Sequence, residues 1–168
     1  MGPDTAILTD GNVTVDVHSR SKKEPDWGWG PRKPPPGTLK RPTVVLEVAV
    51  TDTHAKLLRD VDLWLDPLRG NTTIVIAVKL TSGLRGQRVV IKKFERGEID
   101  GKPVCSQRIQ CHRYPMPYQS DVHVRGPPLT IPFDVLFLRD PVNAEETDST
   151  LGRQELQEIA EWAWDVGE

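Results

Sequence analysis

The chain has 168 residues, of which 37% are hydrophobic and 27% charged, and its formal net charge is −2. This length and composition favour one domain with a modest core. The balanced charge excludes the overall basic excess that dedicated nucleic-acid binders usually carry. Lysine and arginine do gather at 22–41 and at 85–96, where a solvated surface is the simpler interpretation and a local basic patch is the alternative.

Targeting and membrane signals are missing from the pattern. No window approaches the roughly 20 apolar residues that a membrane-spanning helix needs, and residues 1–16 lack the charged start and apolar run of a signal peptide. Two cysteines, Cys105 and Cys111, do not make a disulfide framework. We therefore expect a protein of the cytoplasm or nucleus with no membrane partner.

The N-terminal part contains one expected strand and one stiff loop. Residues 1–11 show no periodic pattern and are expected to be irregular, whereas residues 12–18 alternate polar and apolar side chains as a half-buried strand does. The proline-rich segment 31–37 is incompatible with a helix interior or a central strand, so we expect a loop there.

A strand–helix–strand unit over 42–80 is the clearest element of the sequence. Residues 43–50 are almost continuously apolar and β-branched, a pattern typical of a strand that is covered on both faces. Helix-capping side chains at 51–53 then precede an apolar stripe that predicts a helix over 54–66. A second buried strand is expected at 72–80, so that the unit forms a right-handed crossover between parallel strands.

The C-terminal half is less regular. Residues 88–94 predict a further, antiparallel strand, and 97–128 predict a loop-rich excursion with room for one strand. Residues 129–138 return to the core, and a linker with a C-terminal helix is expected over 141–168. The domain itself would then span 12–140.

One carboxylate stands out from this background. Glu47 is the only charged residue inside an apolar strand, and a buried carboxylate is costly unless a cation, a metal or hydrogen bonds compensate it. Upstream, Pro25 and Asp26 lie between a strand and a loop. Two such carboxylates on neighbouring strands can hold Mg²⁺, which prefers oxygen ligands and can activate water against a phosphodiester.

This arrangement resembles a known signature. Pro25-Asp26, followed after 20 residues by Glu47-Val48-Ala49, is similar to the PD-(D/E)xK signature of metal-dependent nucleases. The longer strings at 24–31, 42–53, 57–65 and 126–139 resemble uncharacterised fungal proteins, which look like distant relatives of the Uma2-type family of restriction-endonuclease-like proteins. The resemblance implies an α/β fold of restriction-endonuclease type with a mixed central sheet, and Asp26 and Glu47 as magnesium ligands.

The sequence departs from that signature at the lysine. The family has a lysine two residues after the glutamate, where this chain has Ala49, and alanine cannot orient water or stabilise charge. Lys56 and Lys79 are candidate replacements, and Lys56 is the better one because it lies just beyond the strand end that carries Glu47. An ordinary surface lysine is the alternative. Family members also tend to carry an N-terminal helix, for which residues 1–11 are too short.

Two functions follow. The first is a metal-dependent nuclease that acts on nucleic acid, with Asp26, Glu47 and Lys56 as catalytic residues and Mg²⁺ held by the two carboxylates. The second is a catalytically inactive nuclease-like fold that serves as a binding or interaction module. In that case Glu47 would be satisfied by Arg41, Lys79 or backbone donors, and Asp26 would cap a loop.

Overall fold

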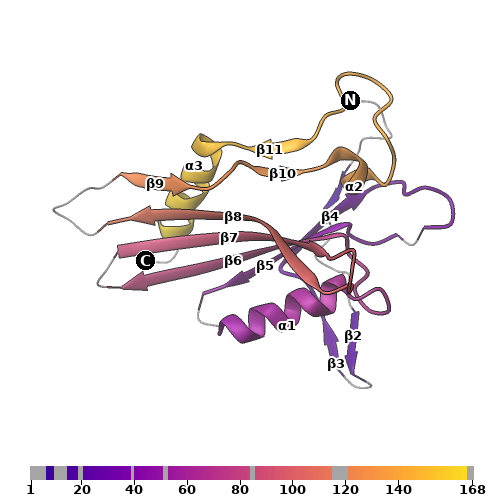
Figure 1. Cartoon of the computed structure of the whole chain (residues 1–168), viewed down its shortest axis with the longest axis horizontal. Helices are drawn as coiled ribbons and strands as arrows, with labels where there is room; N and C mark the ends of the chain where they lie inside the picture. Colours follow the sequence, from indigo (N-terminus) through magenta and orange to yellow (C-terminus); the bar gives the residue numbers. More distant parts are fainter. Residues whose placement is uncertain are drawn as a thin grey trace.

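The computed structural model describes residues 7–9, 15–18, 21–38, 40–50, 53–83, 86–114 and 121–165. Seven strands form its central sheet: β1 (Ile7–Thr9), β4 (Trp27–Pro31), β5 (Val44–Ala49), β6 (Ile74–Gly83), β7 (Gly86–Arg96), β8 (Pro103–Arg113) and β9 (Val122–Arg125). They lie in the order β1-β4-β5-β6-β7-β8-β9 (Figure 1). β5 and β6 are parallel and the other neighbours are antiparallel, so the expected mixed sheet is confirmed.

The remaining elements lie outside this sheet. Two short hairpins pair β2 (Val15–His18) with β3 (Ser21–Lys23), and β10 (Leu129–Ile131) with β11 (Ser149–Leu151). The helices are α1 (His54–Leu65), α2 (Phe133–Phe137) and α3 (Arg153–Asp165). The described part of the chain contains no helix with the length and apolar character needed to cross a membrane.

The β5–α1–β6 crossover forms as its sequence predicts. The Thr53 side chain accepts a hydrogen bond from the backbone N–H of Lys56 at 3.2 Å, which satisfies one of the donors left open at the start of α1. Residues 51 and 52, which the sequence also offered as caps, lie outside the described residues. α1 ends at Leu65, and β6 then runs parallel to β5 in a register that pairs Glu47 with Ala77.

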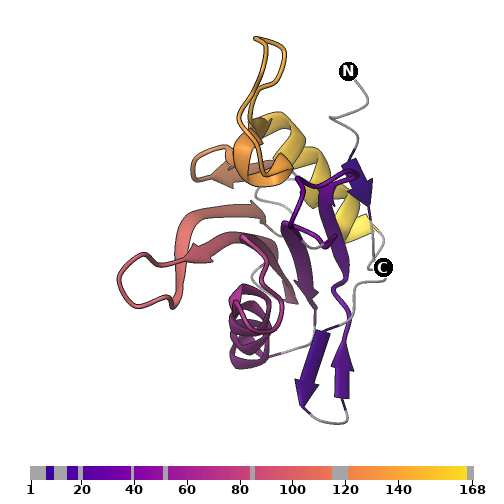
Figure 2. The ribbon, with the colours of Figure 1, turned by 90° about the vertical axis from the view of Figure 1, so that its right-hand side faces the viewer.

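The sheet is covered on both faces, by α1 on one and by α2 and α3 on the other (Figure 2). The alternation of β6 shows the division, because Val75 packs toward α1 whereas Ile74 and Ile76 pack toward α3. On the α1 side the largest buried side chain is Trp64, of which only 1% is exposed. Burying one large apolar side chain stabilises a fold by about 1.5–3 kcal/mol, so both layers contribute to the free energy of unfolding.

Two expectations about the less regular parts were wrong. The segment 97–128 contains a strand of 11 residues, β8, and a second strand, β9, in place of a loop-rich excursion. Its apolar alternation is short, and the extended form is stabilised by pairing with β7, which no local pattern reveals. At the N-terminus, Ile7–Thr9 pairs with β4, so the irregular segment includes a strand.

The other boundaries agree with the sequence. The C-terminal helix, for which the apolar pattern predicts Leu151 to Val166, is α3; it begins only at Arg153 because Leu151 ends β11, and Val166 lies outside the described part. The strand expected at 12–18 is present as β2, while residues 12–14 also lie outside it. β7 is antiparallel to β6, as expected.

Gly70 tests the junction that joins α1 to β6. A Cβ at this position would lie 2.5 Å from the Trp64 Cα, inside the backbone of the helix end. We expect Gly70→Ala to lower the free energy of unfolding by about 1–3 kcal/mol, the usual cost of overpacking. Urea unfolding measures the change, with Gly83→Ala as control because nothing lies within 4 Å of its Cβ position. Equal stability of the two variants would contradict the close contact between Gly70 and the end of α1.

Candidate functional site

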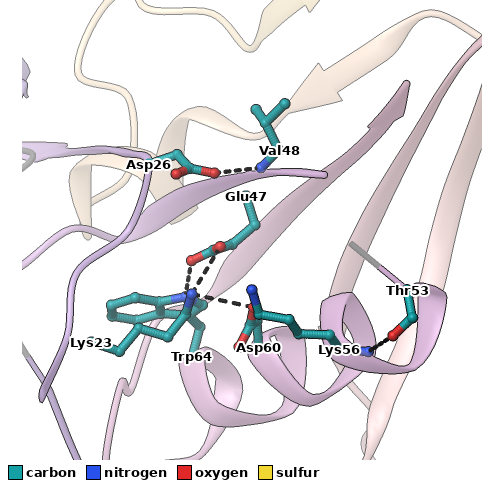
Figure 3. Close-up of polar contacts among 8 residues, drawn as sticks. All are labelled: Lys23, Asp26, Glu47, Val48, Thr53, Lys56, Asp60 and Trp64. Atoms are coloured by element: carbon teal, nitrogen blue, oxygen red, sulfur yellow. Dashed lines mark hydrogen bonds and ion pairs between the residues drawn. The ribbon is translucent and has the colours of Figure 1, made fainter. Parts of the chain in front are cut away.

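Glu47 lies in the middle of β5 with its side chain directed toward α1 (Figure 3). It is 4% exposed, the burial of a core residue. Its Oε1 accepts a hydrogen bond from the Trp64 indole Nε1 at 2.6 Å, and its Oε2 accepts one from the Lys23 Nζ at 3.1 Å. Both carboxylate oxygens of Glu47 therefore accept hydrogen bonds from other elements of the fold.

Lys23 bridges two carboxylates. Its Nζ lies 3.1 Å from Glu47 Oε2 and 3.2 Å from Asp60 Oδ2. Asp60 and Trp64 are four residues apart on α1 and hence share a helix face, while Lys23 arrives from the end of β3. We call Lys23, Glu47, Asp60 and Trp64 the Glu47 cluster.

Asp26 lies immediately before β4 and next to this cluster. Trp27 pairs with Leu46 in the antiparallel β4–β5 ladder, so the preceding Asp26 comes opposite Glu47. Its Oδ2 accepts a hydrogen bond from the backbone N–H of Val48 at 2.6 Å. Figure 3 shows the Asp26 carboxylate directed at that backbone group and the Glu47 carboxylate directed at α1. The β4–β5 pairing thus places Asp26 and Glu47 opposite each other along the backbone. Their carboxylates, however, bond to different groups.

The pKa values of Glu47 and Lys23 are both raised. Burial raises the pKa of Glu47 above its ordinary value and the nearby Asp26 charge adds to this, although Lys23 and the Trp64 indole act in the opposite direction. Burial by itself would lower the pKa of Lys23, but attraction to Glu47 and Asp60 outweighs it and raises that pKa. The two shifts are compatible because Lys23 faces two carboxylates, whereas Glu47 faces one ammonium group and is more deeply buried.

The sequence named other cations as partners of Glu47. Lys56 is exposed in the first turn of α1, and Figure 3 shows its side chain extending along the helix toward Asp60. Lys79 donates to the Val50 carbonyl at 3.2 Å, and Arg41 donates to the Gly70 carbonyl at 3.1 Å. The lysine in contact with Glu47 is Lys23, which sequence reasoning missed because a lysine three residues before Asp26 looks like part of a solvated charge run.

Whether a divalent cation suits this site follows from its donors. The described residues contain no group of three or more His, Cys, Asp or Glu side chains that could hold a metal ion. Asp26 and Glu47 still offer carboxylate oxygens, the ligands that Mg²⁺ prefers. The Lys23 ammonium group marks a place beside Glu47 Oε2 that already holds a positive charge. A cation bound to Glu47 Oε2 would have to displace that ammonium group, which would keep its second contact to Asp60.

Comparison of the chain with protein-family models, with curated proteins and with solved structures gives no match.

Replacing Lys23 tests the electrostatic balance of the cluster. We expect Lys23→Met to raise the pKa of Glu47 further, because the lysine charge and hydrogen bond both lower it. A raised folded-state pKa gives stability that is present below the unfolded-state value, ordinarily 4.5, and is lost as the pH rises through the folded-state value. The free energy of unfolding of the variant should therefore fall more steeply than that of the wild type as the pH rises above 4.5.

A pH titration of the Glu side-chain carboxyl carbons by NMR measures the pKa, and urea unfolding across the same pH range measures the stability. Lys22→Met removes an exposed neighbouring charge and serves as the control. An unchanged Glu47 pKa in Lys23→Met would contradict the ion pair.

Proposed function

We propose that this protein is a metal-dependent nuclease of PD-(D/E)xK type, in which Asp26 and Glu47 hold Mg²⁺ and Lys23 supplies the amine that the signature lacks at Ala49. The supporting observation is the Lys23 Nζ at 3.1 Å from Glu47 Oε2, with Asp26 in register opposite Glu47 where β4 pairs with β5. The lysine comes from a different strand, β3, and contacts Glu47, whereas the Asp26 carboxylate accepts from the backbone N–H of Val48. Phosphodiesters of nucleic acid are the substrate class.

In this proposal Asp26 and the residues of the Glu47 cluster have different roles. Asp26 and Glu47 would offer the oxygen ligands, and Mg²⁺ bound to them would supply Lewis acidity and activate water. Asp60, at 3.2 Å from the Lys23 Nζ, keeps the ammonium group beside the carboxylates, where it orients the attacking water or stabilises charge on the phosphate. The Trp64 indole fixes the orientation of Glu47 through its 2.6 Å hydrogen bond.

A second function is favoured by one observation. Lys23 and Trp64 already satisfy both oxygens of Glu47, as a purely structural ion pair would. In that case the fold has lost the chemistry and serves as a binding module.

Metal binding and strand cleavage separate these functions. We expect wild-type protein to bind Mg²⁺ or Mn²⁺ in calorimetry and to nick plasmid DNA. Asp26→Asn and Glu47→Gln should lose both, because each removes one anionic ligand. Lys23→Met should retain metal binding, because its ammonium group competes with the cation, and should lose about 10²–10⁴-fold in nicking rate, the usual contribution of a positioned proton donor or acceptor.

Glu24→Gln is the matched control, since Glu24 is exposed and close in sequence to the site. Wild-type protein that is folded, binds neither ion and nicks nothing would refute the nuclease and leave the binding module. Nicking that persists in Glu47→Gln would reveal a contaminating enzyme.

A further inference from the structure

One face of the sheet is only partly covered. α1 packs on β5 and β6 and reaches the end of β7 at Phe94 and Arg96, where Arg96 donates to the Leu65 carbonyl. On the opposite face, α3 packs on alternate side chains of β8 and β9: Ile109, Cys111, Val122 and Val124. Because successive residues of a strand point to opposite faces, the residues between these point to the side of α1, beyond the helix.

Those intervening positions are rich in positive charge. The same alternation in β7 places Val89 and Ile91 toward α3 and their neighbours on the other side. We define the basic face by its charged and imidazole side chains: Arg88, Lys92, Arg108, His112, His123 and Arg125. Cross-strand pairing makes them contiguous, with Arg88 opposite His112 and His112 opposite His123.

The face carries like charges in direct opposition. Lys92 pairs with Arg108 across β7 and β8, an arrangement that destabilises a sheet. The carboxylate of β7, Glu95, lies on the other face, where it pairs with Lys93 at 3.4 Å. β7, β8 and β9 themselves add no carboxylate to the basic face, and Asp121, two residues before His123, brings one acid to its edge. The chain as a whole has a net charge of −2, so the excess of positive charge on this face is a local feature.

Planar rings border the same face. Tyr114 follows β8 and is 39% exposed. Its ring lies 4.2 Å from that of His112 and 5.7 Å from that of His123, measured between centroids. An exposed aromatic ring beside arginines is the combination on which unpaired bases stack while their phosphates are neutralised.

We propose that the basic face binds single-stranded nucleic acid, with its phosphates on Arg88, Arg108 and Arg125 and a base on the Tyr114 ring. Neighbouring strands lie about 4.8 Å apart and residues four apart on one strand about 13 Å, so the three guanidinium groups span several nucleotides. The binding goes beyond the proposed nuclease and does not depend on it, because α1 stands between the Glu47 cluster and this face. An anion here would also relieve the repulsion between Lys92 and Arg108.

The test is fluorescence anisotropy with a labelled oligothymidylate of roughly 16 nucleotides, the upper site size of one compact single-strand-binding fold. EDTA is present, so that no cleavage occurs. The test variant is Arg88→Gln with Arg125→Gln, and the control is Arg32→Gln with Lys33→Gln, two exposed residues of the loop after β4. Both doubles change the net charge equally, and circular dichroism verifies that each is folded.

We expect the test variant to bind about tenfold or more weakly than the wild type, with the slope of log affinity against log salt reduced by about 1.4, or about 0.7 per phosphate contact. The control should stay within about twofold of the wild type, since its charges lie elsewhere. Tyr114→Leu should weaken binding by about fivefold or more. Because EDTA removes the metal that the proposed nuclease needs, a failure of this binding and a failure of nicking are told apart.

Three results would overturn the proposal. They are no binding by the wild type at low salt, equal weakening by the two double variants, and tighter binding of a duplex of equal length with no effect of Tyr114→Leu. The last result would assign the face to double-stranded backbone instead.

Discussion

The burial of one carboxylate organises the α1 side of this fold. An ionised Glu47 beneath a helix is tolerable only with donors on its oxygens, and these come from α1 through Trp64 and from β3 through Lys23. Trp64 in turn contacts the next segment, since its carbonyl accepts the backbone N–H of Thr72 at 2.9 Å just before β6 begins. One charged group therefore ties the hairpin, the central strand and the crossover helix into a single arrangement.

Opposing effects act on the pKa of this carboxylate. Burial raises the pKa of Glu47 while the ion pair lowers it, and burial prevails. A purely structural ion pair would gain from full compensation, because an apolar replacement is often as stable as a buried charge pair. Sites that bind cations or move protons instead keep ionisable groups incompletely compensated. Glu47 has donors on both oxygens and still a raised pKa, and the proposed exchange of the Lys23 ammonium group for a cation rests on that combination.

The sequence predicted what depends on local pattern. The β5–α1–β6 crossover and α3 follow from apolar periodicity and capping, and Glu47 was recognisable because a charge interrupts an apolar strand. β8 and β9 were missed because pairing with β7 stabilises them, and pairing partners far apart in sequence leave no local trace. Lys23 and Asp60 were missed for a related reason: each looks like a surface charge until β3 and α1 bring them to the same carboxylate.

The uncovered basic face follows from the dimensions of the elements. A helix about 10 Å across cannot cover seven strands at about 4.8 Å spacing, so α1 leaves part of its face bare, whereas α2 and α3 share the opposite one. Solubility requires only that the bare part be polar, and a mixture of signs would meet that need without repulsion. The chain instead sets Lys92 against Arg108 and adds Arg88 and Arg125 beside them. This repulsion, retained where it is easily avoided, is what the proposed polyanion would relieve.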